Sequence, residues 1–179
     1  RQLVLTNEAL VQAVRQQLPE LPVANVVGEP CKRDTAPCIG LAAALVQRDD
    51  ADATMAVMPS DHVITSAKQF QAAIQAGSDL IDQDPSRIVT FGIRPTYAAE
   101  SFGYIQRGQR LQAADSINAF QVECFREKPD RETAESYLSA GTFYWNSGIF
   151  LWRASTILDA LRQNVPKMYQ HIQQIAASM

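Results

Sequence analysis

Apolar positions along the chain fall into short runs that are separated by longer amphipathic stretches. The short runs are rich in Val, Leu, Ile and Met, a pattern typical of strands in the sheet of an α/β protein. The expected strands cover residues 3–5, 23–29, 54–58 and 88–93. The run at 54–58 has no charge and stops at Pro59, so we expect a strand buried on both faces of a mostly parallel sheet.

Helical spacing of apolar residues fills the intervals between these strands. Thr6 or Asn7 fits the cap of a helix that runs to about residue 18, and a second amphipathic helix is expected at 67–82. Between them, residues 39–46 are mostly small, which lets a helix lie close against a sheet. Asp34 or Thr35 fits the N-cap of that helix, and Pro37 fits its first turn.

The second half of the chain continues the alternation of strands and helices. A loop is expected at 94–103, half-exposed strands at 104–106 and 121–125, and a helix from Asp130 or Arg131 that ends at Gly141. The aromatic stretch 143–152 is broken by Asn146-Ser147-Gly148, and two helices follow at 154–163 and from 166 onward. This order predicts a three-layer α/β domain.

Composition and charge narrow the classes of function. Hydrophobic residues make up 46% of the 179 residues and charged residues 20%, which is typical of a globular domain. The net charge of -3 indicates neither a nucleic-acid partner nor a basic membrane surface, and no apolar run reaches the roughly 20 residues of a membrane span. The three cysteines form no Cys-x-x-Cys motif, so we expect free thiols and a cytoplasmic protein.

Several signatures of phosphate binding and of nucleophilic catalysis are absent from the sequence. It contains no Gly-x-Gly pair, no Gly-Lys-Ser/Thr and no Gly-x-Ser-x-Gly. A dinucleotide-binding dehydrogenase, a P-loop kinase and an α/β-hydrolase are therefore disfavoured.

Asp61 follows the expected strand at 54–58 and is the first candidate for chemistry. Ligands of open α/β sheets collect at the carboxyl ends of strands. Mg²⁺ usually takes only one or two protein carboxylates and completes its shell with water and substrate phosphates. Asp61 is therefore a candidate Mg²⁺ ligand, and the alternative is that it caps the next helix.

Other polar clusters lie at expected strand ends and helix starts, where α/β scaffolds carry function. Each also has a plainer interpretation. Glu127-Lys128-Pro129 is typical of a solvated turn, and Asn146-Ser147-Gly148 of a tight turn. The clusters are residues 29–37, 60–62, 102–104, 126–129 and 145–148.

Taken together, these clusters resemble the mannose-1-phosphate guanylyltransferases, a family of sugar nucleotidyltransferases that make GDP-mannose. The resemblance runs from near residue 1 to beyond residue 160, and its motifs occur in the order found in the family. It implies a Rossmann-like nucleotidyltransferase fold that transfers GMP from GTP to mannose 1-phosphate and releases pyrophosphate. The motifs are Glu-Pro-x-x-Arg-Asp-Thr-Ala-Pro, Pro-Ser-Asp-His, Phe-Gly-Ile-x-Pro-Thr, Phe-Gly-Tyr-Ile, Glu-Lys-Pro and Tyr-Trp-Asn-Ser-Gly-Ile-Phe.

The sequence departs from the family pattern in two ways. Mild departures are Asp34 for the usual Asn, Ser60 for Ala, and Ser101-Phe102 for Gly-Tyr. The family's opening Gly-rich loop and its later Asp-Val-Gly-Ser-Trp element, which bears a second metal-binding aspartate, are both missing. We therefore expect residues 1–179 to be a single nucleotidyltransferase domain that is incomplete at both ends.

The resemblance implies roles for residues in the first cluster. Glu29 is the candidate for reading guanine, because a carboxylate accepts hydrogen bonds from N1–H and the exocyclic amine together, a pair that adenine lacks. The alternative for Glu29 is an exposed strand end. Arg33 and Lys32 either meet phosphates or remain solvated, and Asp34 either contacts the nucleotide or caps the helix. The nucleotide-binding set is Glu29, Pro30, Arg33, Asp34, Thr35, Ala36 and Pro37.

The resemblance also implies metal-binding, sugar-binding and catalytic residues. Asp61 holds Mg²⁺ and counts as catalytic, while His62 beside it is expected to be structural. Lys128 is catalytic and suits the sugar phosphate as a point charge. Glu127 and Asn146 suit sugar hydroxyls, and Gly103 allows close approach of the backbone. Tyr144 and Trp145 are expected in the core or in a pocket wall.

Alternative functions are a catalytically inactive nucleotide-sugar-binding fragment, or a nucleotidyltransferase for another base or sugar. The expected partners are GTP and mannose 1-phosphate, with neither nucleic acid nor membrane. The sequence leaves homo-oligomerisation open.

Overall fold

The computed structural model describes residues 1–31, 33–112 and 117–179. These residues form two compact units. The terminal unit comprises Arg1–Ala53 and Ala154–Met179, and the central unit comprises Thr54–Arg153. Each unit contains both strands and helices, which confirms the α/β class predicted from the sequence.

A pair of parallel strands opens the terminal unit. β1 (Val4–Asn7) runs parallel to β2 (Val26–Glu29), and the register places Asn7 opposite Glu29. The second strand is shorter than the expected 23–29, because its first residues form the 3-10 helix η2 (Val23–Asn25). Parallel strands need a crossover connection, which here contains two further helical segments. These are η1 (Glu8–Leu10) and α1 (Val11–Gln17).

The helix expected from residue 7 to 18 is therefore divided. Asn7 does serve as an N-cap, because its Oδ1 accepts a hydrogen bond of 2.9 Å from the amide of Ala9. The turn that it caps is the 3-10 helix η1, and α1 begins only at Val11. The sequence predicted the cap correctly but not the change of helix type after it.

Three helices pack together in the terminal unit. α2 (Thr35–Asp49) contacts both α5 (Ala154–Asn164) and α6 (Pro166–Ser178). A Cβ at Gly40 would lie 2.5 Å from Cδ1 of Ile172 and 2.8 Å from Cδ1 of Leu161. The small residues of α2 thus allow a close approach to helices, whereas we expected them to face a sheet.

The long strand β7 (Phe143–Arg153) organises the central unit. It pairs with three strands, and β5 also pairs with β6 (Ala119–Arg126); all of these pairings are antiparallel. The partners of β7 are β3 (Thr54–Val57), β4 (Val89–Ile93) and β5 (Tyr104–Leu111).

The expected mostly parallel pairing is therefore not found in this sheet. Leu151 of β7 lies opposite Ala56 of β3 and also opposite Val89 of β4. β3 and β4 consequently run in the same direction, but β7 lies between them in the opposite direction. The insertion of β7 converts what would be a parallel neighbour pair into two antiparallel pairs.

The Asn146-Ser147-Gly148 segment lies inside β7, so the expected break and the tight-turn interpretation are both wrong. Asn146 pairs with Gly92 of β4, Ser147 is buried, and Gly148 has φ +70°. Neighbouring strands supply hydrogen bonds and side-chain contacts that override the local turn preference.

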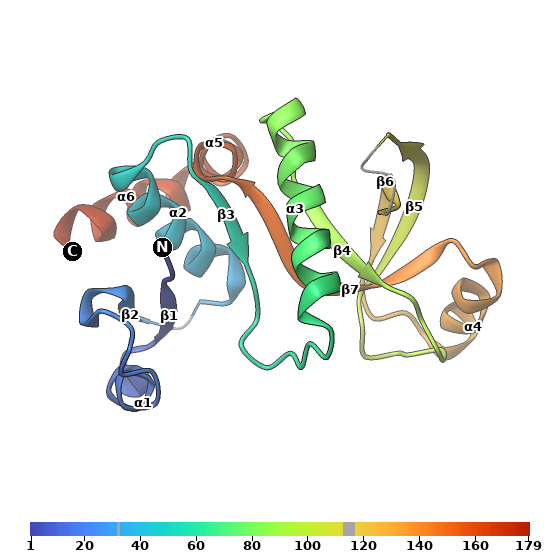
Figure 1. Cartoon of the computed structure of the whole chain (residues 1–179), viewed down its shortest axis with the longest axis horizontal. Helices are drawn as coiled ribbons and strands as arrows, with labels where there is room; N and C mark the ends of the chain where they lie inside the picture. The colour runs from blue at the N-terminus through green and yellow to red at the C-terminus, as the bar shows by residue number, and fades with distance from the viewer. Residues whose placement is uncertain (32, 113–116) are drawn as a thin grey trace. The chain divides into compact units, whose positions relative to one another are not determined.

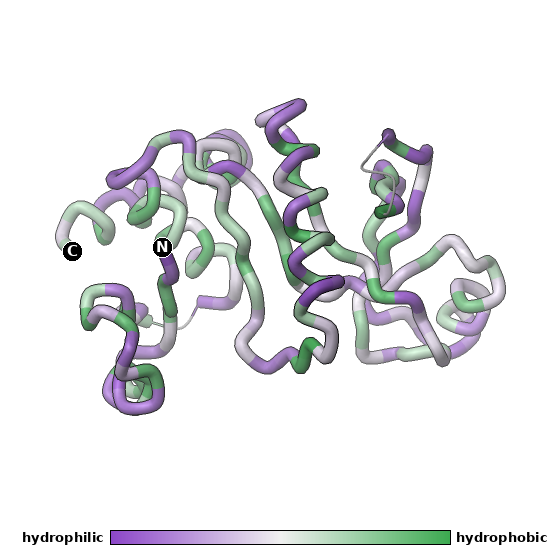
Figure 2. Tube along the Cα trace, in the orientation of Figure 1, coloured by the Kyte–Doolittle hydropathy of each residue, from purple (hydrophilic) through white to green (hydrophobic). Residues whose placement is uncertain are grey.

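The helix α3 (Ala67–Gln83) packs against β3, β4 and β7 of the central unit (Figure 1). Hydrophobic and hydrophilic residues alternate along it (Figure 2), as the amphipathic pattern predicted. The strand β3 differs from expectation, because Met55 is buried while Thr54 and Ala56 are exposed. Among the described pairings β3 has β7 as its neighbour on one side only, which leaves it less covered than a central strand.

The helix α4 (Arg131–Ala140) has the two ends that the sequence predicted. Oδ1 of Asp130 accepts a hydrogen bond of 2.9 Å from the amide of Thr133, and Gly141 follows the helix with φ +65°. The side-chain oxygen satisfies one free N–H of the first turn, and glycine adopts the left-handed C-terminal residue at little steric cost.

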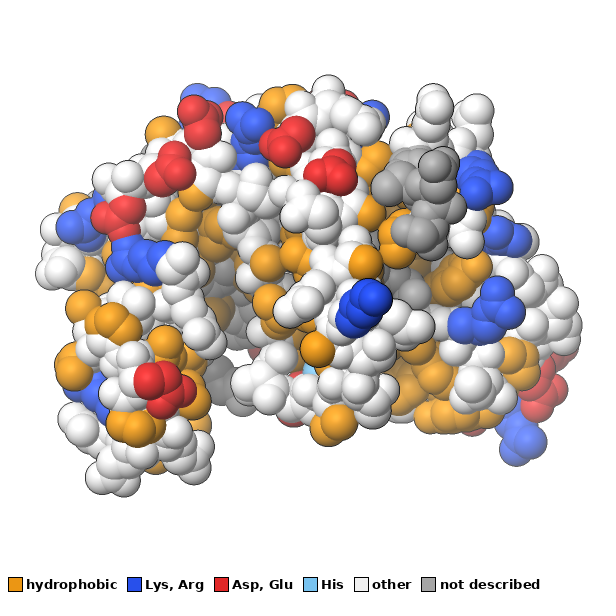
Figure 3. Space-filling model, viewed as in Figure 1, with side chains coloured by type: hydrophobic (Ala, Val, Ile, Leu, Met, Phe, Trp, Pro, Cys, Tyr) orange, Lys and Arg blue, Asp and Glu red, His pale blue; other side chains and the backbone are white. Residues whose placement is uncertain are grey.

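On the face drawn in Figure 3, hydrophobic side chains are interspersed with acidic and basic ones. Within the described ranges, no helix combines the length and the apolar character needed to cross a bilayer.

Candidate functional site

The candidate nucleotide-binding residues all belong to the terminal unit. Glu29 is the last residue of β2 and is half-buried, so the interpretation as a freely exposed strand end does not describe it fully. The thiol of Cys38, in the first turns of α2, is close enough to the Glu29 carboxylate for that carboxylate to raise its pKa. Burial, followed by this contact with Glu29, raises the pKa of Cys38 to about 12. Cys38 therefore remains a neutral donor beside Glu29.

Cys38 was missed by the sequence reasoning, which used the cysteines only to judge disulfides and metal motifs. The position of Cys38 in the sequence, one turn into the helix that follows Glu29, was a signal for this contact. A residue one turn into a helix faces back toward its N-terminus, and the strand before that helix ends at Glu29. A donor at position 38 was thus placed to reach the carboxylate.

Asp34 precedes α2 in an unusual backbone conformation. Its φ is 63°, and its side chain makes no capping hydrogen bond to the helix. With ψ at -167°, this conformation lies in a region that is essentially restricted to glycine, and a residue with a side chain occupies it at a cost of roughly 1–3 kcal/mol. The side-chain cap expected as one alternative is therefore absent, and the Asp34 carboxylate is exposed.

The first turn of α2 has free backbone N–H groups and no acidic residue, an arrangement that favours anions. Pro37 lies in this turn as expected and is half-buried. Lys32 lies outside the described residues. The other candidates around the turn are exposed: Pro30, Arg33, Thr35 and Ala36.

The candidate sugar-binding residues meet in the central unit. A Cβ at Gly103 would lie 2.8 Å from Oε2 of Glu127 and 3.6 Å from Cβ of Asn146. The amide of Asn146 donates a hydrogen bond of 2.8 Å to the carbonyl of Gly103. Three residues from distant parts of the sequence therefore lie together, at the point where β5, β6 and β7 adjoin.

Lys128 lies beside Glu127 in a strained backbone conformation. Its φ is 42°, although it precedes Pro129 and such residues favour extended backbone. Its Nζ lies 3.8 Å from Oε1 of Glu127, and both side chains are largely exposed. Asp34 and Lys128 are the two non-glycine residues with positive φ in the described chain, and both are candidate site residues. Strain of this kind clusters at functional sites.

Asp61 lies in the loop that follows β3, and its side chain is exposed, as is that of His62. The alternative that Asp61 caps the next helix is wrong, because α3 begins at Ala67 with Ser66 at the N-cap position. The loop leaves the sheet beside β7, since a Cβ at Gly148 would lie 3.4 Å from Cγ of Pro59.

Asp61 offers a single carboxylate, which fits a metal ion that takes few ligands from the protein. Across the described ranges, no three His, Cys, Asp or Glu side chains are grouped to hold a metal. Within the same ranges, Asp61 has no hydrogen-bond or ion-pair partner, so its oxygens are available. A single free carboxylate suits Mg²⁺ that binds one or two protein ligands together with phosphates.

Trp145 belongs to an aromatic group that the sequence reasoning did not assemble. Its ring lies 5.0 Å from the ring of Tyr97 and 5.1 Å from that of Phe102, both in edge-on geometry. Trp145 and Tyr144 are half-buried, in keeping with the expectation of a core or wall position. Tyr97 and Phe102 lie in the loop at 94–103, which these contacts fasten to β7.

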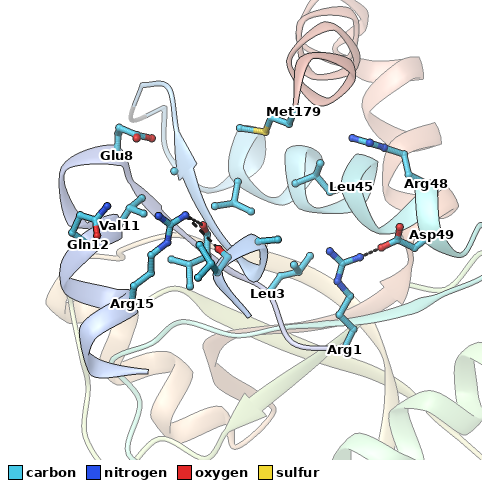
Figure 4. A pocket seen from close by; sticks show the side chains of 15 residues that line it. Arg1, Leu3, Glu8, Val11, Gln12, Arg15, Leu45, Arg48, Asp49 and Met179 are labelled. Carbon is cyan, nitrogen blue, oxygen red and sulfur yellow. Dashed lines mark hydrogen bonds and ion pairs between the residues drawn. The ribbon is translucent and has the colours of Figure 1, made fainter. Parts of the chain in front are cut away.

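A cavity of about 780 Å³ lies elsewhere in the terminal unit, and none of the candidate residues lines it. Figure 4 shows Arg1, Arg15 and Arg48 around it, and each has a protein partner. Arg1 forms an ion pair with Asp49, Arg48 donates to the carbonyl of Ala176, and Arg15 donates to backbone carbonyls. We therefore do not assign the chemistry to this cavity.

Comparison with known proteins gives consistent matches. The sequence model of a family described as nucleotidyl transferase matches residues 1–179. Mannose-1-phosphate guanylyltransferase 2 of Escherichia coli O157:H7 is 42% identical over 183 residues, which cover 98% of this chain and 38% of that protein. The mannose-1-phosphate guanylyltransferase of Klebsiella pneumoniae is 40% identical over 174 residues, which cover 96% and 36%.

A solved structure agrees with the sequence matches. The crystal structure described as mannose-1-phosphate geranyltransferase from Thermus thermophilus matches with a TM-score of 0.84 at 25% identity, over 99% of this chain and 49% of that one. The resemblance that the motifs indicated is confirmed by these relatives. The chain spans 38% and 36% of the length of the two curated relatives.

Proposed function

Because this chain belongs to the nucleotidyl transferase family, we propose that it transfers GMP from GTP to mannose 1-phosphate, giving GDP-mannose and pyrophosphate. In this reaction a phosphate oxygen of the sugar phosphate attacks the α-phosphorus of GTP. The new O–P bond forms as the bond from the α-phosphorus to the bridging oxygen breaks, and pyrophosphate leaves. The protein forms no covalent bond, so its part is positioning and charge neutralisation.

The observation that carries the proposal is the meeting of Gly103, Glu127 and Asn146, with Lys128 adjacent. Glu127 accepts hydrogen bonds from sugar hydroxyls, and Asn146 both donates and accepts. Gly103 leaves room for a hexose because it has no Cβ. The Lys128 ammonium neutralises charge on the sugar phosphate and on the reacting α-phosphate. This combination suits a phosphorylated sugar better than an apolar ligand.

The terminal unit supplies the residues that we propose for the nucleotide. The Glu29 carboxylate accepts from N1–H and the exocyclic amine of guanine, and the Cys38 thiol holds that carboxylate in orientation. A site that hydrogen-bonds its substrate in this way rejects an analogue without the donors by a large factor. Arg33, Asp34 and the start of α2 (Thr35, Ala36 and Pro37) surround the nucleotide, and Pro30 shapes the approach.

We propose Asp61 as the protein ligand of Mg²⁺. The ion, when bound, offsets the negative charge of the phosphate oxygens. Asp61 is suited to this role because it is exposed and has no partner within the described ranges. His62 remains a structural neighbour in this proposal.

We further propose that the two units belong to one catalytic domain of a longer enzyme, to which other segments contribute a Gly-rich loop and a second metal-binding aspartate. The short span of the chain relative to its guanylyltransferase relatives supports this. The three free cysteines accord with a cytoplasmic location.

Pyrophosphate release tests the proposal. The full-length enzyme that contains this chain is incubated with Mg²⁺, mannose 1-phosphate and GTP, and parallel reactions contain ATP, UTP or TTP, or glucose 1-phosphate as the acceptor. Release that is fastest with GTP and mannose 1-phosphate supports the proposed reaction. Faster release with another base or sugar assigns a different nucleotidyltransferase, and GDP-mannose binding without turnover assigns a binding module.

A pair of variants makes this experiment specific to the proposed metal ligand. Asp61→Ala abolishes pyrophosphate release, whereas Asp79→Ala, on the exposed side of α3, leaves it unchanged. Circular dichroism checks that both variants fold. Turnover retained in Asp61→Ala removes Asp61 from the mechanism.

A further inference from the structure

The side chain of Tyr104 is fully buried, yet its hydroxyl is satisfied by a single residue of a loop. The hydroxyl accepts a hydrogen bond of 2.9 Å from the amide of Ala99 and donates one of 2.9 Å to the carbonyl of the same residue. Ala99 is itself only 2% exposed. Ala99 lies in the loop at 94–103 that joins β4 to β5. The middle of this loop is therefore tied to the first residue of β5.

A second attachment holds the same loop to the neighbouring strand. The rings of Tyr97 and Phe102 pack edge-on against Trp145 of β7. Tyr104 and Trp145 lie directly opposite each other in the pairing of β5 with β7. One cross-strand pair thus holds the loop at three points, namely Tyr97, Ala99 and Phe102.

The last residue of this loop is Gly103, which lies against Glu127 and Asn146. Side chains of consecutive extended residues point to opposite faces of a sheet. Tyr104 points to the face where its ring meets Tyr137 of α4, at 5.3 Å between centroids. Gly103 opens toward the other face. The fixed side chain of Tyr104 therefore sets where the backbone of Gly103 lies relative to Glu127.

We propose that Tyr104 is a positioning residue for the sugar-phosphate site, acting through the hydrogen bonds of its hydroxyl to Ala99 and the resulting placement of Gly103. This inference rests on the function proposed above and identifies a residue that does not itself touch substrate. A phenylalanine would fill the same space against Tyr137. It would leave the buried amide and carbonyl of Ala99 without their partner, and buried polar groups without partners are costly. The loop then opens to regain hydrogen bonds with water.

The test compares Tyr104→Phe with the control Tyr137→Phe, which removes a hydroxyl from the adjacent ring and leaves the Ala99 contact in place. Hydrogen exchange, followed by mass spectrometry, is measured over residues 94–103. We expect about tenfold faster exchange in this segment for Tyr104→Phe, and wild-type exchange for Tyr137→Phe. Unchanged exchange in Tyr104→Phe overturns the inference, whatever the activity of the chain.

Steady-state kinetics of pyrophosphate release provide the second readout. Tyr104→Phe is expected to raise KM for mannose 1-phosphate about tenfold and to leave KM for GTP within about twofold of wild type. A loss of stability alone would change the two KM values together, or it would leave both unchanged. Faster loop exchange with an unchanged KM for mannose 1-phosphate overturns the positioning role while the proposed reaction stands.

A full-length wild-type enzyme without turnover on GTP and mannose 1-phosphate instead overturns the proposed function, and the positioning role falls with it. If Tyr104→Phe does not fold, Phe102→Ala serves as the second variant. It removes another attachment of the loop at an exposed position. It should raise exchange at 94–103 and KM for mannose 1-phosphate in the same direction, and wild-type values of both overturn the inference.

Discussion

Gly103 and Glu127 lie so close together that a Cβ at residue 103 would be 2.8 Å from Oε2 of Glu127. Any other residue at this position must displace the carboxylate. Because Glu127 is the proposed acceptor for sugar hydroxyls, its displacement weakens binding of the sugar phosphate. The contact therefore gives a direct test of the site.

We predict that Gly103→Ala lowers kcat/KM for mannose 1-phosphate by about 10²-fold, the effect expected for a displaced positioning group. The control is Gly108→Ala in the strand β5 that follows, where a Cβ would lie 3.1 Å from Oε2 of Glu123, which has no proposed role. Steady-state kinetics and a thermal melt measure both variants. An equal loss in both would show that the effect is general to the sheet.

Two substitutions of Lys128 separate the effect of its charge from the effect of its strained backbone conformation. Lys128→Gly and Lys128→Ala both remove the ammonium group, and both should lose turnover. Glycine tolerates φ 42° without steric cost, so Lys128→Gly should be the more stable of the two by roughly 1 kcal/mol. Urea denaturation measures the difference. Equal stabilities would mean that the conformation is not strained.

The role of Glu29 predicts a change in base selectivity. A glutamine at residue 29 presents one acceptor and one donor, so it can no longer accept from both guanine groups. Glu29→Gln should reduce the preference for GTP over ATP by about two orders of magnitude or more. The ratio of kcat/KM for the two nucleotides is the measurement. A ratio equal to that of the wild type argues against base reading by Glu29.

The raised pKa of Cys38 predicts a slow reaction with alkylating agents. The pKa moves from 9.0 to about 12, first through burial and then through Glu29, and this change leaves about a thousandfold less thiolate at pH 8. Iodoacetamide should therefore label the exposed Cys31 much faster than Cys38, and labelling of Cys38 should accelerate as pH rises. Glu29→Gln should accelerate it at constant pH, and mass spectrometry of the labelled peptides reads each site.

The N-cap of α4 predicts a pH-dependent contribution to stability. The hydrogen bond from Thr133 lowers the pKa of Asp130 below its ordinary value of 3.8. A lowered folded-state pKa means that the stabilisation is present above the ordinary value and is lost as pH falls through the folded value. Asp130→Ala should therefore lower Tm at pH 7 by a few degrees, roughly, and this difference should shrink as pH falls below 3.8. Asp130→Asn retains a capping oxygen and should keep most of the Tm at both pH values.

Local signals predicted the ends of elements well. Asp130 and Gly141 bound α4 as expected, and Asn7 caps the turn after β1, because capping depends on residues within a few positions. The same local reasoning failed at Asn146-Ser147-Gly148. There the turn preference of the segment is overridden by the strands on either side of β7.

The sequence by itself determined the α/β class, the helix caps and the residue types that suit a nucleotidyltransferase, because each follows from spacing or from a motif. Only the tertiary structure decided that β7 separates β3 from β4, that the Cys38 thiol meets Glu29, and that Tyr104 holds Ala99. These contacts join residues whose meeting depends on strand order and register. Strand order and register are set by packing of the whole sheet, which no short window of sequence contains.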